Sequence, residues 1–183
     1  ALDNDTTLWI KSVRFGFMNQ QTNNNKGYFR QVNTAEKYEA GESYPLEIVT
    51  ASNQSGPANV YLRVWMDVNA DRDFYDAGEL LIDTFLPGGT LNAFLQIPAN
   101  SSIGDKRQRL RVATSRFAPP EACGDFTNGE MEDYRIITLP QDITNRPSED
   151  RSSTLAASGF LYPNPAVDAA WVSLKGYDGQ ACK

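Results

Sequence analysis

The sequence predicts an all-β fold, an antiparallel β-sandwich of about eight strands of the jelly-roll or immunoglobulin-like kind. Its apolar runs are short and rich in Val, Ile, Phe, Tyr and Trp, the residues that favour strands. Turn-forming residues separate these runs at short intervals, with 13 Gly and 10 Pro in 183 residues. No stretch is convincing as a helix, so an α/β fold fits less well than a sandwich.

The first half of the chain predicts three strands. In residues 8–18 apolar side chains alternate with polar ones, and a one-residue slip near Ser12 indicates a β-bulge. An Asn/Gln-rich loop over 20–27 precedes a short strand at 28–32. A turn over 39–43, which contains Gly41, leads into a strand over 44–50.

The second half predicts five more strands. Residues 59–66 are the strongest of all, with Val60, Leu62, Val64 and Met66 on one face. Further strands are expected over residues 79–86, 90–97, 107–114 and 134–139, the first two joined by a turn at 87–89.

A change in composition after Leu139 divides the chain into three parts. Residues 1–139 are expected to form the sandwich, and 140–158 contain almost nothing to bury, as in a solvated linker. Residues 159–183 become apolar again and are expected to form a short β-rich tail.

Composition excludes several classes of function. A net charge of −6 makes nucleic acid a poor partner, and the absence of an apolar stretch of about 18 residues predicts no transmembrane helix. The chain contains no histidine, which removes the Ser-His-Asp and Cys-His catalytic arrangements and zinc sites that use imidazole. The two cysteines, Cys123 and Cys182, could form a disulfide or remain thiols.

An oxygen-rich loop directly follows the strongest strand. We expect six side chains in it to bind a metal ion: Asp67, Asn69, Asp71, Asp73, Asp76 and Glu79. Calcium takes six to eight oxygen ligands, and alternate spacing in a tight loop points successive carboxylates to one centre. The spacing resembles the start of an EF-hand loop, but Arg72 stands where a glycine is usual and no flanking helices are predicted. The alternatives are a solvated acidic loop or, less well matched, magnesium.

A second acidic cluster lies near the end of the predicted sandwich. Glu130, Glu132 and Asp133 are weaker candidate ligands, which could bind the same ion or hold the first loop in place. They could equally form salt bridges with an arginine of the neighbouring strands. In an alternating strand the two glutamates share one face and Asp133 takes the other.

Two motifs resemble the GEVED domain family. Residues 129–134 read Gly-Glu-Met-Glu-Asp-Tyr, and residues 65–74 read Trp-Met-Asp-Val-Asn-Ala-Asp-Arg-Asp-Phe before Gly78-Glu79. The chain departs from the family pattern in Met131 for Val and in Arg72 for Gly. The resemblance covers roughly residues 7–139 and implies a secreted bacterial β-sandwich that is often attached to larger exported proteins.

The tail resembles a second family. Tyr162-Pro163-Asn164-Pro165, followed by an apolar run, is similar to the start of the C-terminal sorting domain of type IX secretion, a system of the Bacteroidetes. The tail is shorter than such domains and looks truncated. The resemblance implies that residues 159–183 engage the secretion machinery, so that the protein is extracellular or anchored at the outer-membrane surface.

These observations support one function and leave two alternatives. The first is a secreted or cell-surface calcium-binding module, not an enzyme, that acts in adhesion or ligand binding, with a surface glycan or a protein as its partner. The second is a subunit of an extracellular filament that self-assembles by adding a strand to a neighbour's sheet. The third is a hydrolase that uses paired carboxylates, for example Glu130 or Glu132 with Asp73, although no nucleophile–base pair is apparent.

Overall fold

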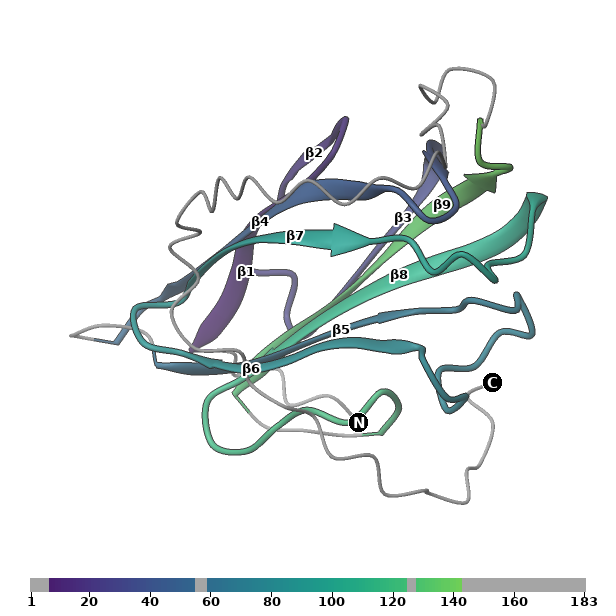
Figure 1. Cartoon of the computed structure of the whole chain (residues 1–183). Helices are drawn as coiled ribbons and strands as arrows, with labels where there is room; N and C mark the ends of the chain where they lie inside the picture. Colours follow the sequence, from purple (N-terminus) through teal and green to yellow (C-terminus); the bar gives the residue numbers. More distant parts are fainter. Residues whose placement is uncertain (1–6, 55–58, 125–127, 143–183) are drawn as a thin grey trace, which may run out of the picture. The chain divides into compact units, whose positions relative to one another are not determined.

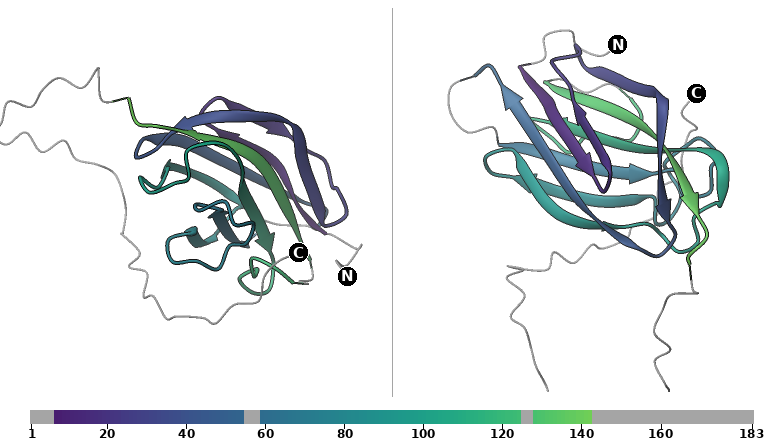
Figure 2. Two further views of the ribbon diagram at one scale, coloured as in Figure 1. Left: turned by 90° about the vertical axis from the view of Figure 1, so that its right-hand side faces the viewer. Right: turned by 90° about the horizontal axis from the view of Figure 1, so that it is seen from above.

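The computed structural model describes residues 7–54, 59–124 and 128–142, which form nine strands (Figure 1). These are β1 (Leu8–Phe15), β2 (Met18–Gln21), β3 (Tyr28–Glu39), β4 (Ser43–Ser52), β5 (Val60–Met66), β6 (Leu80–Leu86), β7 (Thr90–Gln96), β8 (Gly104–Ser115) and β9 (Gly129–Leu139). They build a four-stranded sheet in the order β2-β1-β4-β7 and a five-stranded sheet in the order β3-β9-β8-β5-β6. Figure 2 shows the two layers from further directions. The all-β sandwich class is confirmed.

One core fills the space between the sheets. Leu62 and Val64 of β5, with Ile10 and Val13 of β1, are fully buried there. The alternation predicted for β5 is therefore the alternation between the core and the outer face of the five-stranded sheet. The described residues contain no helix long and apolar enough to cross a membrane.

The strand pairing confirms one local prediction and corrects another. The register of β1 against β4 shifts between Ile10 and Ser12, so the predicted bulge is present. The sandwich is not wholly antiparallel, because β3 pairs with β9 in the parallel direction. The sequence of a strand reveals its periodicity but not which distant strand it pairs with. The pairing of β3 with β9 could therefore not be predicted.

Several strand bounds differ from the predicted ones. A short hairpin strand, β2, forms partly inside the predicted loop 20–27, and β3 continues to Glu39 because it pairs with β9 along both halves. β9 begins at Gly129, five residues before the predicted start at 134, because its acidic side chains have partners inside the fold. The predicted tail 159–183, Cys182 and nearly all of the linker lie outside the described residues.

Candidate metal centre

The loop between β5 and β6 is curled by repeated side-chain-to-backbone hydrogen bonds. The side-chain oxygens of Asn69, Asp71 and Asp73 each accept a bond from the backbone N–H two residues later, at 3.0 Å in all three cases. Between them Ala70 and Arg72 take left-handed backbone conformations, with φ of 64° and 84°. The alternate spacing seen in the sequence therefore produces a chain of tight turns.

Arg72 occupies the loop position where a glycine is usual, and its backbone is in the left-handed region. Arg72 adopts the φ that a glycine would take without strain. Its carbonyl accepts a hydrogen bond from the Arg109 guanidinium of β8 at 2.5 Å. This contact helps hold a backbone conformation that costs an ordinary side chain about 1 kcal/mol or more.

Further bonds fix the first turn of the loop to the sandwich. The Val68 carbonyl accepts from the backbone N–H of Ser102 at 2.7 Å and from the Gln108 side chain at 3.1 Å. The Ser102 hydroxyl donates to the Asn69 carbonyl at 2.8 Å. The loop entrance is thus held by the residues around the start of β8.

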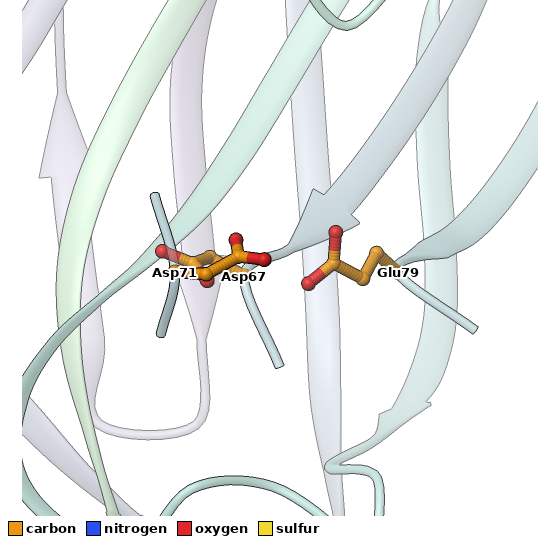
Figure 3. A group of neighbouring side chains, drawn as sticks. All are labelled: Asp67, Asp71 and Glu79. Atoms are coloured by element: carbon orange, nitrogen blue, oxygen red, sulfur yellow. The ribbon is translucent and has the colours of Figure 1, made fainter. Parts of the chain in front are cut away.

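Three carboxylates from the two ends of this loop meet at one point. Asp67, Asp71 and Glu79 each place an oxygen within 4.8 Å of the others. Figure 3 shows Asp67 beside Asp71, with the Glu79 carboxylate directed toward them from the start of β6. Asp67 is fully buried and Glu79 is nearly so, whereas Asp71 is exposed.

Asp67 is the exceptional member of this trio. Both of its carboxylate oxygens are buried and accept no hydrogen bond of acceptable geometry. Burial raises the pKa of Asp67 to about 6, opposed by the Arg109 charge and by the nearby backbone amides of Arg72 and Ala70. A charged group removed from water without a partner costs several kcal/mol. The ionised Asp67 carboxylate is therefore not compensated by any hydrogen bond within the described residues.

Glu79 is better satisfied than Asp67. Its two oxygens accept from the backbone N–H groups of Val68 at 2.9 Å and Asp76 at 3.2 Å. Burial nevertheless raises the pKa of Glu79 to about 7, and the Asp67 and Asp76 charges add to the shift. Two carboxylates with raised pKa values that face each other are the electrostatic signature of a cation site or of a shared proton.

The outer part of the loop holds a second trio. Asp71, Asp73 and Asp76 also bring oxygens within 4.8 Å of one another, but none of them is buried. The Asn69 amide donates to Asp71 at 2.9 Å and to Asp76 at 2.5 Å. All six side chains predicted for the loop thus lie in one network, with Asp67 and Glu79 innermost.

The acids of β9 behave differently. Glu130 is fully buried, and its oxygens accept from the backbone N–H groups of Ile10 at 2.7 Å and Asn25 at 2.8 Å. Glu132, on the same face, accepts a short hydrogen bond from the Tyr134 hydroxyl, while its other oxygen is buried without a partner. Burial raises the pKa of both, that of Glu132 to about 7. Glu130 thus joins β9 to β1 of the other sheet.

Asp133 faces the opposite side of the sheet, as the alternation predicts. It forms a two-pronged ion pair with Arg111, with bonds of 2.6 and 2.7 Å. It also accepts from the Tyr28 hydroxyl at 3.0 Å, and Arg109 lies 3.7 Å away. Of the alternatives considered for Asp133, the structure shows the salt bridge to Arg111.

An aromatic ring connects this ion pair to the acidic loop, residues 67–79 between β5 and β6. Phe74 is buried on the outer face of the five-stranded sheet, in a small cluster with Trp65 and Met131. The guanidinium groups of Arg109 and Arg111 lie over its ring, 4.9 and 4.6 Å from the centroid. Phe74 therefore packs the loop onto the charged pair on β8 and β9. Sequence reasoning did not assign Phe74 this role, although its position among the aspartates was a signal.

Comparison with known proteins supports part of the resemblance. The family model of the GEVED domain matches residues 61–137, a range that contains both the acidic loop and the acidic run of β9. The chain is thus similar to this domain over β5 to β9. A search of curated proteins finds no match to the chain.

Proposed function

We propose that the chain is a secreted or cell-surface calcium-binding β-sandwich module that acts in adhesion or ligand binding and is not an enzyme. The observation that carries the calcium site is the buried Asp67 carboxylate, which has no hydrogen-bond partner on either oxygen and faces Asp71 and Glu79. A cation at this point supplies the missing charge.

The donor set favours calcium over other ions. Every candidate ligand in the loop is a carboxylate or an amide oxygen, and calcium accepts six or more oxygens in flexible geometry. Zinc prefers nitrogen and sulfur ligands, and the chain contains no histidine. Magnesium retains several of its waters, so a loop that supplies many side-chain oxygens suits it less well.

The proposed role of the ion is structural. Asp67 directly follows β5 and Glu79 directly precedes β6, so an ion bound between them ties the two strand ends together. It also neutralises acids that otherwise repel one another. We expect the loop to present a fixed surface only when the ion is bound.

The non-catalytic and extracellular parts of the proposal rest on different support. Glu130 and Asp133 are occupied by backbone N–H groups and by Arg111, which leaves them poorly placed for acid–base chemistry.

Export is supported by the resemblance of residues 159–183 to a sorting signal. A truncated chain without residues 159–183 should fail to reach the cell surface when both forms are expressed in a bacterium that has type IX secretion. Equal surface labelling of both forms would contradict the proposed role of residues 159–183 in export.

Thermal melting tests the calcium site. A ligand at 100 times its dissociation constant stabilises a protein by about 2.7 kcal/mol, which corresponds to a rise in Tm of roughly 5–10 °C for a domain of this size. We expect that rise when EGTA is replaced by calcium, and a much smaller one with magnesium. Light scattering of the same samples shows whether the ion also changes the state of assembly.

A matched pair of variants assigns the effect to the loop. Asp67→Asn should abolish the calcium-dependent rise, whereas Asp83→Asn should keep it, because Asp83 of β6 pairs with Arg63 outside the loop at 2.9 Å. Equal melting of the wild type with calcium and with EGTA would contradict the proposal, as would a full calcium response in Asp67→Asn.

A further inference from the structure

The strand β7 is an unusual sheet edge. It ends the four-stranded sheet and pairs in unbroken register with β4 on its other side (Figure 1). Its sequence, Thr-Leu-Asn-Ala-Phe-Leu-Gln, contains no charged residue, proline or glycine. Within the described ranges, no strand pairs with its outer edge. Such an edge presents unpaired backbone groups to any strand that approaches it.

The other three edges are protected in the usual ways. β2 is only four residues long. β3 contains charged residues and a register shift between Gln31 and Glu36. β6 carries Asp83, which is ion-paired with Arg63. Charge, shortness and irregular register all discourage edge-to-edge pairing, so β7 is the edge best suited to it.

The sequence of β7 is complementary to itself. When two copies pair in the antiparallel direction with Ala93 on the two-fold axis, Leu91 lies opposite Leu95 and Asn92 lies opposite Phe94. Leu95 is buried and Leu91 is packed against the core, so each apolar pair would extend the existing core across the boundary. No like charges meet, because the strand has none.

A hollow in the outer face fits this register. The Phe94 side chain is 77% exposed, an unusual position for a large apolar ring. Beside it lies a shallow depression of about 460 Å³, lined by Asn92, Phe94, Pro45 and Glu47 among others. In the symmetric pair, Phe94 of the second copy lies opposite Asn92, at the wall of the depression. Each copy then offers one ring and one hollow.

We propose that β7 is a homodimerisation edge: two copies of this chain pair β7 to β7 about Ala93 and form one continuous eight-stranded sheet. The partner is a second copy because β7 supplies both members of each apolar pair, and β7 together with its neighbour β4 supplies both the ring and the hollow. This inference goes beyond the calcium site and does not depend on it.

The register makes the proposal testable by charge placement. Asn92→Lys with Phe94→Lys puts two positive charges opposite each other at both pairs, whereas Asn92→Lys with Phe94→Glu puts opposite charges there. Both positions are exposed. Both variants place the same lysine opposite Glu47 of β4, so the two should melt alike. Opposed like charges destabilise a strand pair and opposite charges stabilise it. We expect the dimer dissociation constant of the first variant to exceed that of the second by at least tenfold.

Sedimentation equilibrium of the whole chain, with calcium and with EGTA, provides the readout. The wild type should form a concentration-dependent dimer, the Lys/Lys variant should be monomeric, and the Lys/Glu variant should dimerise. A wild type that stays monomeric at all concentrations would overturn the proposal. A dimer that both variants leave unchanged, or that both abolish, would overturn the assigned register. Failure of calcium binding with dimerisation intact would count against the metal site alone.

Discussion

The acidic loop and the first half of β9 are both rich in acids, yet their buried carboxylates differ in how the protein satisfies them. On β9, Glu130 accepts two backbone hydrogen bonds and Asp133 forms a two-pronged ion pair. In the loop, Asp67 is just as buried but both of its oxygens lack a partner. The density of acids in a sequence therefore does not identify a cation site. What distinguishes the loop is a buried carboxylate with neither oxygen satisfied by the protein, whereas Glu132 on β9 has one oxygen bonded to Tyr134.

The same contrast separates two roles that acidic side chains have within residues 61–137. The β9 acids fix the fold, through the core on one face and through Arg111 on the other. In the loop, the buried Asp67 carboxylate has no comparable partner within the described part of the chain. Phe74 of the loop packs beneath Arg109 and Arg111 of β8. The loop is therefore supported by the same arginines that surround Asp133 on β9.

The largest expected effect comes from breaking the β9 ion pair. Asp133→Ala leaves the Arg111 guanidinium buried without its main partner, and breaking a buried pair from one side costs about 3–5 kcal/mol. Chemical denaturation in saturating calcium should show a loss of this size. Replacing both members by apolar residues, Arg111→Met with Asp133→Leu, should recover much of it. A loss below 1 kcal/mol in the single variant would show that the pair is not structural.

A somewhat smaller effect is expected from Phe74→Ala. Removing a buried ring costs about 3 kcal/mol or more in a core, and somewhat less here because the ring lies under a surface loop. The same change should weaken calcium binding, because the ring packs the loop onto β8 and β9. Calcium titrations of Phe74→Ala and Phe74→Leu separate these effects. Unaltered calcium affinity in Phe74→Ala would contradict the proposed coupling.

The pH dependence of stability probes Glu132. Its pKa is about 7 in the folded protein and 4.5 in the reference state, so the folded state binds more protons in this interval. The free energy of unfolding should therefore fall as pH rises from about 4.5 to about 7, by about 1 kcal/mol per unit. Excess calcium keeps the loop acids ionised during the measurement.

Glu132→Gln isolates this contribution. The amide keeps the size of the side chain and an acceptor for the Tyr134 hydroxyl, but it carries no charge. The variant should show a shallower slope, because the raised pKa of Glu130 still contributes, and it should melt a few degrees above the wild type at pH 8. Parallel stability profiles of the two proteins between pH 5 and 8 would exclude a raised Glu132 pKa as the cause.

The smallest effect is expected from Arg72→Gly. Glycine takes a φ of 84° without strain, whereas arginine does not. Relief of that strain, offset in part by the greater freedom of the unfolded chain, should stabilise the loop by up to about 1 kcal/mol. Differential scanning calorimetry with calcium should show a Tm at or slightly above that of the wild type. A clear decrease would mean that the arginine side chain itself supports the loop.

Much of this fold could be predicted from local patterns. The alternation of β5, the bulge of β1 and the two faces of the β9 acids all follow from a two-residue period that the sequence displays directly. The parallel pairing of β3 with β9 could not be predicted, because it joins segments about 100 residues apart in the chain. The start of β9 at Gly129 was missed because a run of acidic residues is typical of a loop, and the buried partners of these acids are not visible in the sequence.

The candidate site was predicted in composition but not in internal order. The sequence indicated all six candidate ligands in one loop, and the structure brings them into one network. It did not indicate that Asp67 and Glu79 are the buried members, or that Arg109 and Phe74 hold the loop to the sheet. Those contacts depend on β8, which is distant in sequence from the loop.

Calorimetric titration with calcium tests the central claim most directly, namely that the unpartnered Asp67 carboxylate is the core of a cation site. It should be carried out on the wild type, Asp67→Asn and Glu132→Gln, since the last two each neutralise one buried acid. The account predicts that the wild type and Glu132→Gln bind calcium with similar affinity and that Asp67→Asn does not bind. Equal binding by Asp67→Asn, or no binding by the wild type, would contradict it.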